Sequence, residues 1–155
     1  MEPRFNEYLK TLGMTDVFCQ RVESIYDFYV GVLPEKITDI FVSEYLNNDG
    51  SRVFENLWIF TPNYTCEAKS FISIDNFDIM PIESVTRWEL QKENYDFIKA
   101  TEKSRLQVNF NLKHNLTGRL KASQYNCDNL RYIVLTYISK QLVNRIREWK
   151  QPGIV

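Results

Sequence analysis

Few side chains in this chain have the type and spacing that catalysis needs. The single histidine, His114, lies in a predicted turn, where a solvent-exposed side chain is expected rather than a general base. Two carboxylate pairs, Glu83 with Glu89 and Asp75 with Asp78, lie on predicted turns and strand exteriors, where acidic side chains are usually solvated rather than paired as acid and base. The sequence contains no glycine-rich phosphate loop and no GxSxG or HExxH pattern. We therefore expect that the protein is not an enzyme.

Metal and cofactor chemistry is not indicated either. Cys19, Cys66 and Cys127 lie far apart and form no CxxC pair, so we expect small buried apolar residues rather than zinc ligands. No apolar run approaches the ~18 residues that cross a bilayer, and residues 1–7 contain no apolar signal core. These features predict a cytoplasmic protein without a cofactor or a metal site.

The near-neutral total charge conceals a division along the chain. Residues 1–98 carry a net charge of −9, whereas residues 99–155 carry +8. Such a division is typical of a surface that binds an anionic partner, and equally of acidic loops that face basic strands within one domain. The sequence leaves both explanations open.

Four basic residues give the most specific candidate for binding. Arg105, Lys113, Arg119 and Lys121 are predicted to project outward from one hairpin, among amide side chains. They can bind a phosphate group, an acidic protein segment or an anionic lipid surface. Nucleic acid is not favoured, because no outward aromatic residue is available to stack on a base. The alternative role of these cations is to protect an exposed strand from aggregation.

The periodicity of apolar residues predicts an α+β fold. Helices are expected at 4–12, 15–32 and 127–148, where apolar residues recur every three or four positions. Strands are expected at 37–46, 52–60, 64–74, 87–91, 95–101, 105–113 and 119–123. Between the third and the fourth of these strands, residues 77–80 lead to a corner at 81–85.

The strand at 52–60 is apolar on both faces. Phe54, Trp58 and Phe60 alternate with Val53, Leu57 and Ile59, so both faces need a cover. Residues 1–34, which we call the arm, can supply one cover with their two amphipathic helices. We therefore divide the chain into the arm and a β-rich domain at 35–155.

This order of elements resembles the pleckstrin-homology-like superfold of the PH and GRAM type. The resemblance covers 37–149 and rests on element order, on the segment 56–61 (NLWIFT) and on the segment 79–85 (IMPIESV). It implies a seven-stranded antiparallel barrel or sandwich with a C-terminal helix that plugs one end, to which the arm is an addition. Phosphoinositide-binding members hold the headgroup with basic residues around the first hairpin. Here that hairpin, 44–52, is acidic with one arginine, Arg52.

Two functions of different class follow. The first is a non-catalytic interaction module for a protein or peptide partner, with homodimerisation through the arm as one route, because Phe28 falls outside the main apolar face of its helix. The second is a carrier of a lipid or small ligand in a helix-grip-like cavity between the curved sheet and the C-terminal helix. A filled interior distinguishes the module from the carrier, and the many aromatic residues favour a filled interior.

Overall fold

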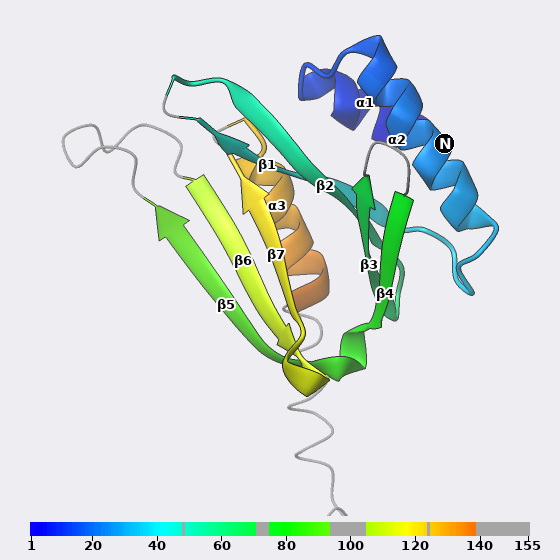
Figure 1. Ribbon diagram of the computed structural model, residues 1–155, viewed down its shortest axis with the longest axis vertical. Coiled ribbons are helices and arrows are strands. Elements are labelled where there is room, and N and C mark those ends of the chain that lie inside the picture. The colour runs from blue at the N-terminus through cyan, green and yellow to red at the C-terminus, as the bar shows by residue number, and fades with distance from the viewer. Residues whose placement is uncertain (48, 71–74, 94–104, 124, 139–155) are drawn as a thin grey trace, which may run out of the picture.

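The computed structural model describes residues 1–47, 49–70, 75–93, 105–123 and 125–138. In this part of the chain, three α-helices and seven antiparallel strands form an α+β fold with two sheets (Figure 1). The helices are α1 (Pro3–Thr11), α2 (Asp16–Val30) and α3 (Cys127–Ile133). The first sheet has the order β1 (Asp39–Leu46), β2 (Arg52–Phe60), β3 (Tyr64–Ser70) and β4 (Asp75–Pro81). The second sheet has the order β5 (Val85–Glu93), β6 (Arg105–Leu112) and β7 (Thr117–Ala122).

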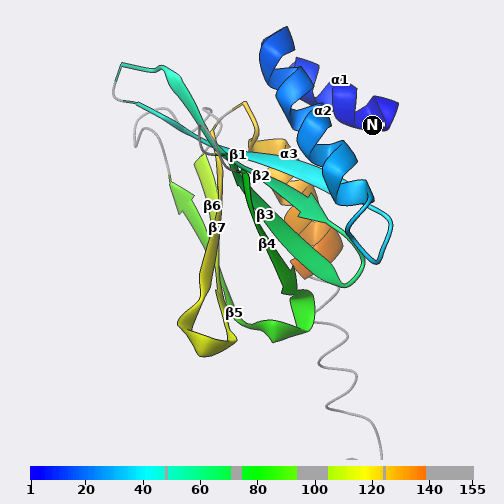
Figure 2. The ribbon, with the colours of Figure 1, turned by 45° about the vertical axis from the view of Figure 1, so that its right-hand side comes forward.

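The arm covers one face of the first sheet (Figure 2). Helix α1 begins at Pro3, and α2 begins after Thr15, whose hydroxyl oxygen accepts a hydrogen bond from the Phe18 amide at 3.4 Å. Gly13, between the helices, has a φ of 74°, which glycine adopts without steric cost. The buried faces of both helices and of the sheet form a first apolar cluster, which includes Leu9, Leu12, Val22, Ile25, Tyr29, Ile40, Val42, Leu57, Ile59 and Cys66.

Strand β2 is covered on both faces, as its sequence predicts. Leu57 and Ile59 belong to the first cluster under the arm. Trp58 and Phe60 belong to a second cluster, which lies between the two sheets. The sheet therefore separates two apolar layers, and the arm supplies the cover of the first.

Phe54 lies on the opposite face from the one that simple alternation predicts. Its ring packs under the arm, with its centroid 5.2 Å from that of Phe18. The pairing of β1 with β2 shifts between Ser43 and Glu44, which leaves Glu55 as an extra residue in β2. A β-bulge of this kind moves every preceding side chain of its strand to the other face.

The second sheet supplies the other side of the second cluster. The alternation of β6 is observed as predicted, with Leu106, Val108, Phe110 and Leu112 buried. Strand β7 runs beside β1, and the backbone N–H of Lys121 donates to the Ser43 hydroxyl at 2.9 Å. Helix α3 lies across the space between the sheets, with Leu130 and Ile133 in the second cluster. Among the described residues, the strands form two separate ladders and not one closed barrel.

Several predicted elements have other bounds in the structure, and some predicted segments lie partly or wholly outside the described residues. Helix α3 ends at Ile133 and continues as a π-helical turn, η3 (Val134–Ile138), and the rest of the helix expected at 127–148 lies outside the described residues. The segment at 77–80 is part of a complete strand, β4, because it pairs with all of β3. The strand expected at 95–101 lies outside the described residues, and β5 pairs directly with β6. The corner at 81–85 is a short 3-10 turn, η1 (Ile82–Ser84).

Buried polar contacts connect the arm to both sheets. The carboxylate of Glu44 accepts hydrogen bonds from Arg52 Nε at 2.8 Å and from the Ser123 hydroxyl at 2.5 Å. The Arg52 guanidinium also donates to the carbonyl of Leu12, at the end of α1. Because Glu44 is fully buried, its charge needs this partner. The contacts join α1, the first hairpin and the loop before α3.

Candidate functional site

The four basic residues predicted as a site do not occupy equivalent positions. Arg119 is exposed on β7, and Lys113 is exposed in the 3-10 turn η2 (Lys113–Asn115) between β6 and β7. Arg105 begins β6, and its side chain lies outside the described part of the structure. Lys121 contacts Glu55 at 3.5 Å, and its ammonium lies 5.2 Å from the centre of the Tyr45 ring. The four positions are therefore spread along the hairpin.

The face that carries Arg119 is a row of hydrogen-bonded polar side chains. Glu89 of β5, Asn109 of β6 and Arg119 of β7 are cross-strand neighbours. The Asn109 amide donates to Glu89 at 3.0 Å and accepts from Gln107 at 2.8 Å. This face thus mixes an acidic group with the predicted cations, which lowers its positive potential.

A groove that sequence reasoning did not predict lies between α2 and the first sheet. We call it the α2–β2 groove, and its volume is about 300 Å³. Most of its lining is apolar, and its polar members are Arg21, Glu55 and Asn56. The apolar lining consists of Met14, Phe18, Val22, Ile25, Val42, Phe54, Leu57 and Ala68.

The β-bulge and the short pairing of β3 create the groove. Strand β3 continues to Ser70 but pairs with β2 only at Leu57–Phe60, so within the described residues no strand pairs with the segment of β2 at 52–56 on that side. The bulge at Glu55 turns Phe54 toward α2, where it forms one wall with Phe18. An unpaired strand edge thus borders an apolar hollow.

The rim of the groove is charged. Arg21 stands on α2, and Glu55 stands on the bulge, where its carboxylate is paired with Lys121. The pair with Lys121 joins the acidic and basic parts of the chain, which is the internal complementarity that the charge division allows. The rim is therefore of mixed sign around an apolar floor.

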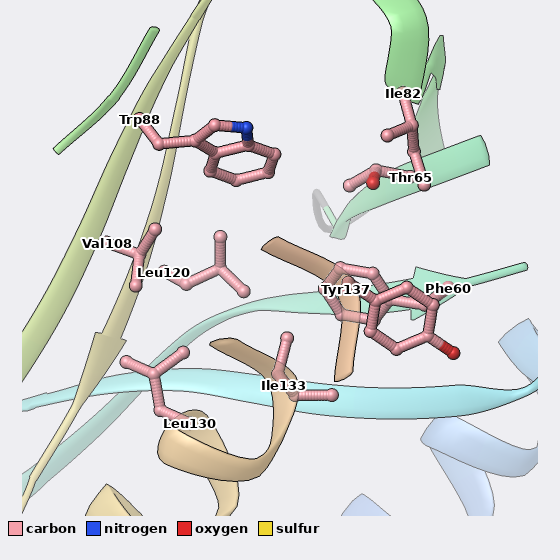
Figure 3. A pocket seen from close by; sticks show the side chains of 9 residues that line it. All are labelled: Phe60, Thr65, Ile82, Trp88, Val108, Leu120, Leu130, Ile133 and Tyr137. Carbon is pink, nitrogen blue, oxygen red and sulfur yellow. The ribbon is translucent and has the colours of Figure 1, made fainter. Parts of the chain in front are cut away.

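The cavity between the sheets is much smaller (Figure 3). Its volume is about 10 Å³, which is space for about one water molecule. Tyr137 closes one side, with its ring 5.1 Å from that of Phe60. The lining residues are Phe60, Thr65, Ile82, Trp88, Val108, Leu120, Leu130, Ile133 and Tyr137. Side chains fill this part of the interior.

The other residues considered for catalysis or metal binding are His114 and the three cysteines, and they differ in burial. His114 is exposed, as predicted, and has a φ of 65°. Cys66 and Cys127 are buried as predicted, whereas Cys19 on α2 is only half-buried, contrary to the prediction. Burial raises the pKa of the Cys66 thiol to about 12. Within the described residues, no three metal-ligating side chains gather at one place. No helix among them is long and apolar enough to span a membrane.

The prediction of dimerisation through the arm rests on Phe28. This side chain contacts another aromatic ring within the chain. Its ring stacks on that of Phe77 in β4, with centroids 5.0 Å apart and planes inclined by 14°. It is nevertheless 55% exposed, so only part of its surface is used.

Comparison with protein-family models, with curated proteins and with solved structures finds no significant match to this chain.

Proposed function

We propose that this chain is a non-catalytic interaction module that binds an extended peptide segment of a partner protein in the α2–β2 groove. One apolar side chain of the peptide occupies the hollow, and its backbone runs along the unpaired edge of β2 at 52–56. The observation that carries the proposal is an apolar hollow of about 300 Å³ beside that edge. A strand edge provides backbone hydrogen bonds, and a pocket beside it provides specificity for a side chain.

The dimensions favour a side chain over a small-molecule ligand. The groove is at the lower end of the ~300–1,000 Å³ range that is typical of small-molecule pockets. The cavity between the sheets has room for about one water molecule, so an acyl chain does not fit in it. Both volumes support the interaction module over the carrier.

The proposal includes a pleckstrin-homology-like fold for the β-rich domain. Sheets of four and three antiparallel strands followed by a helix, with β7 beside β1, support it. In this arrangement the arm is the added part that forms one wall of the groove. The acidic first hairpin supports peptide binding rather than recognition of a phosphorylated headgroup.

Selection of random linear peptides displayed on phage tests the proposal directly. We expect enriched peptides to share one large apolar residue. Ala68→Phe adds a ring to a buried residue that lines the groove, and it should weaken these peptides by about tenfold or more. Gln20→Phe, at an exposed position of α2 outside the lining, is the matched control and should keep full affinity.

Melting temperatures of both variants establish that they are folded. Ala68 borders the hollow but is itself 3% exposed, so the added ring should cost about 1–3 kcal/mol through overpacking. This loss is smaller than the ~5–15 kcal/mol that stabilises a typical domain, so we expect Ala68→Phe to remain folded. Ala68→Leu, a smaller addition, should weaken binding to an intermediate degree. If no peptide is enriched, or if enriched peptides bind folded Ala68→Phe as well as the wild type, the groove is not the site.

A further inference from the structure

Strand β5 is an open edge of the second sheet. It pairs with β6 on one side, and no described strand lies on its other side (Figure 1). The pairing with β6 shifts between Val85 and Arg87 and is regular from Arg87 to Glu93. Such an edge presents a row of N–H and C=O groups to which another strand can pair.

Leu90, in the middle of the regular segment, is uncovered on the face where it should be buried. It pairs with Val108 of β6, which in turn pairs with Leu120 of β7. These two neighbours are 1% and 2% exposed, whereas Leu90 is 58% exposed. The apolar interior face of the sheet therefore continues to β5 without a cover among the described residues.

We propose that β5 pairs in antiparallel fashion with β5 of a second copy of the chain, about a twofold axis at Leu90. This axis lies at the centre of the regular segment and brings the two Leu90 residues together. A twofold contact requires a self-complementary surface, and cross-strand neighbours determine whether β5 has one.

The charges of β5 favour a second copy as the occupant. With the axis at Leu90, Arg87 lies opposite position 93, which is a glutamate, at both ends of the contact. An axis at Glu89 would place two glutamates opposite each other, and an axis at Trp88 would include the irregular pairing at Val85.

The dimer is independent of the α2–β2 groove, which lies over the first sheet under the arm. Dimerisation through β5 also differs from dimerisation through the arm. Each of the two proposals can fail without the other.

Light scattering coupled to size-exclusion chromatography of the full chain, over a range of concentrations, tests the dimer. The wild type should shift from monomer to dimer as concentration rises. Leu90→Lys places two like charges on the axis and should raise the dimer dissociation constant by about tenfold or more. Leu116→Lys, at a comparably exposed leucine after the η2 turn, is the control and should dimerise as the wild type does.

Exchange of charges tests the register. Arg87→Glu and Glu93→Arg should each weaken the dimer, because like charges then lie opposite each other. The double variant should restore the dimer. A wild type that is monomeric at every concentration, a dimer that survives in folded Leu90→Lys, or a double variant that fails to restore the dimer would overturn the proposal.

Discussion

Replacement of Leu130 by alanine measures how much the packing of α3 between the sheets contributes to stability. Leu130 is 0% exposed and lines the small cavity of the second cluster. The change deletes three buried carbon atoms, which is worth about 2.4 kcal/mol of transfer free energy at ~0.8 kcal/mol for each. A residual cavity adds to this loss, because the surrounding strands collapse only partly. We expect the free energy of unfolding to fall by about 3–4 kcal/mol, within the range measured for buried leucines.

Urea denaturation followed by tryptophan fluorescence measures this loss, because Trp58 lies in the same cluster. Leu135→Ala is the control, since Leu135 lies on the following turn and is 69% exposed. Its effect should be within about 0.5 kcal/mol. A loss below about 1 kcal/mol for Leu130→Ala would refute the packed interior, because a helix that lines a ligand cavity loses less on truncation.

Asp39 should make stability depend on pH in the direction opposite to that of a carboxylate whose pKa is lowered by an ion pair. Burial raises the pKa of Asp39 above its ordinary value of 3.8, although hydrogen bonds from Tyr137 and Arg4 act to lower this pKa. The folded state therefore favours the protonated form. The free energy of unfolding of the wild type, relative to that of Asp39→Asn, should therefore rise as pH falls from neutral toward about 4. Urea titrations over this range measure this difference. A difference that falls or stays constant would contradict the assignment. On the second sheet, Arg119→Glu should abolish any salt-sensitive binding to vesicles that contain phosphatidylserine and leave the melting temperature nearly unchanged. Lys121→Glu should in addition lower the free energy of unfolding by about 0.2–1 kcal/mol, because the ion pair of Lys121 with Glu55 is lost. If the wild type does not bind these vesicles, the cations are not a membrane site.

Local patterns in the sequence were sufficient to predict most of the elements. The alternation in β6 and the helical spacing in α2 are set by neighbouring residues, because each pattern must present one apolar face whatever the rest of the chain does. The two-sided character of β2 likewise indicated a second cover, and the arm provides it. The same reasoning identified His114 as exposed and Cys66 and Cys127 as buried.

The candidate sites were decided by tertiary structure. The bulge at Glu55 depends on how β1 and β2 align, and the groove depends in addition on α2 and on where β3 stops pairing. No residue of the groove has an unusual type, so no sequence signal would have found it. The exposure of Leu90 is equally invisible in the sequence, where its alternation predicts a buried side chain.

Contacts between residues distant in the chain explain this difference. Glu44 is acceptable in the interior because Ser123, 79 positions away, and Arg52 satisfy its carboxylate. Gly118 is required because the Phe110 ring lies against it, so that an added Cβ would be 2.0 Å from the ring Cζ. A local pattern fixes which face of an element is apolar, since that depends on the period of the backbone. Which elements then meet, and where a face is left open, depends on packing among residues that the sequence does not place together.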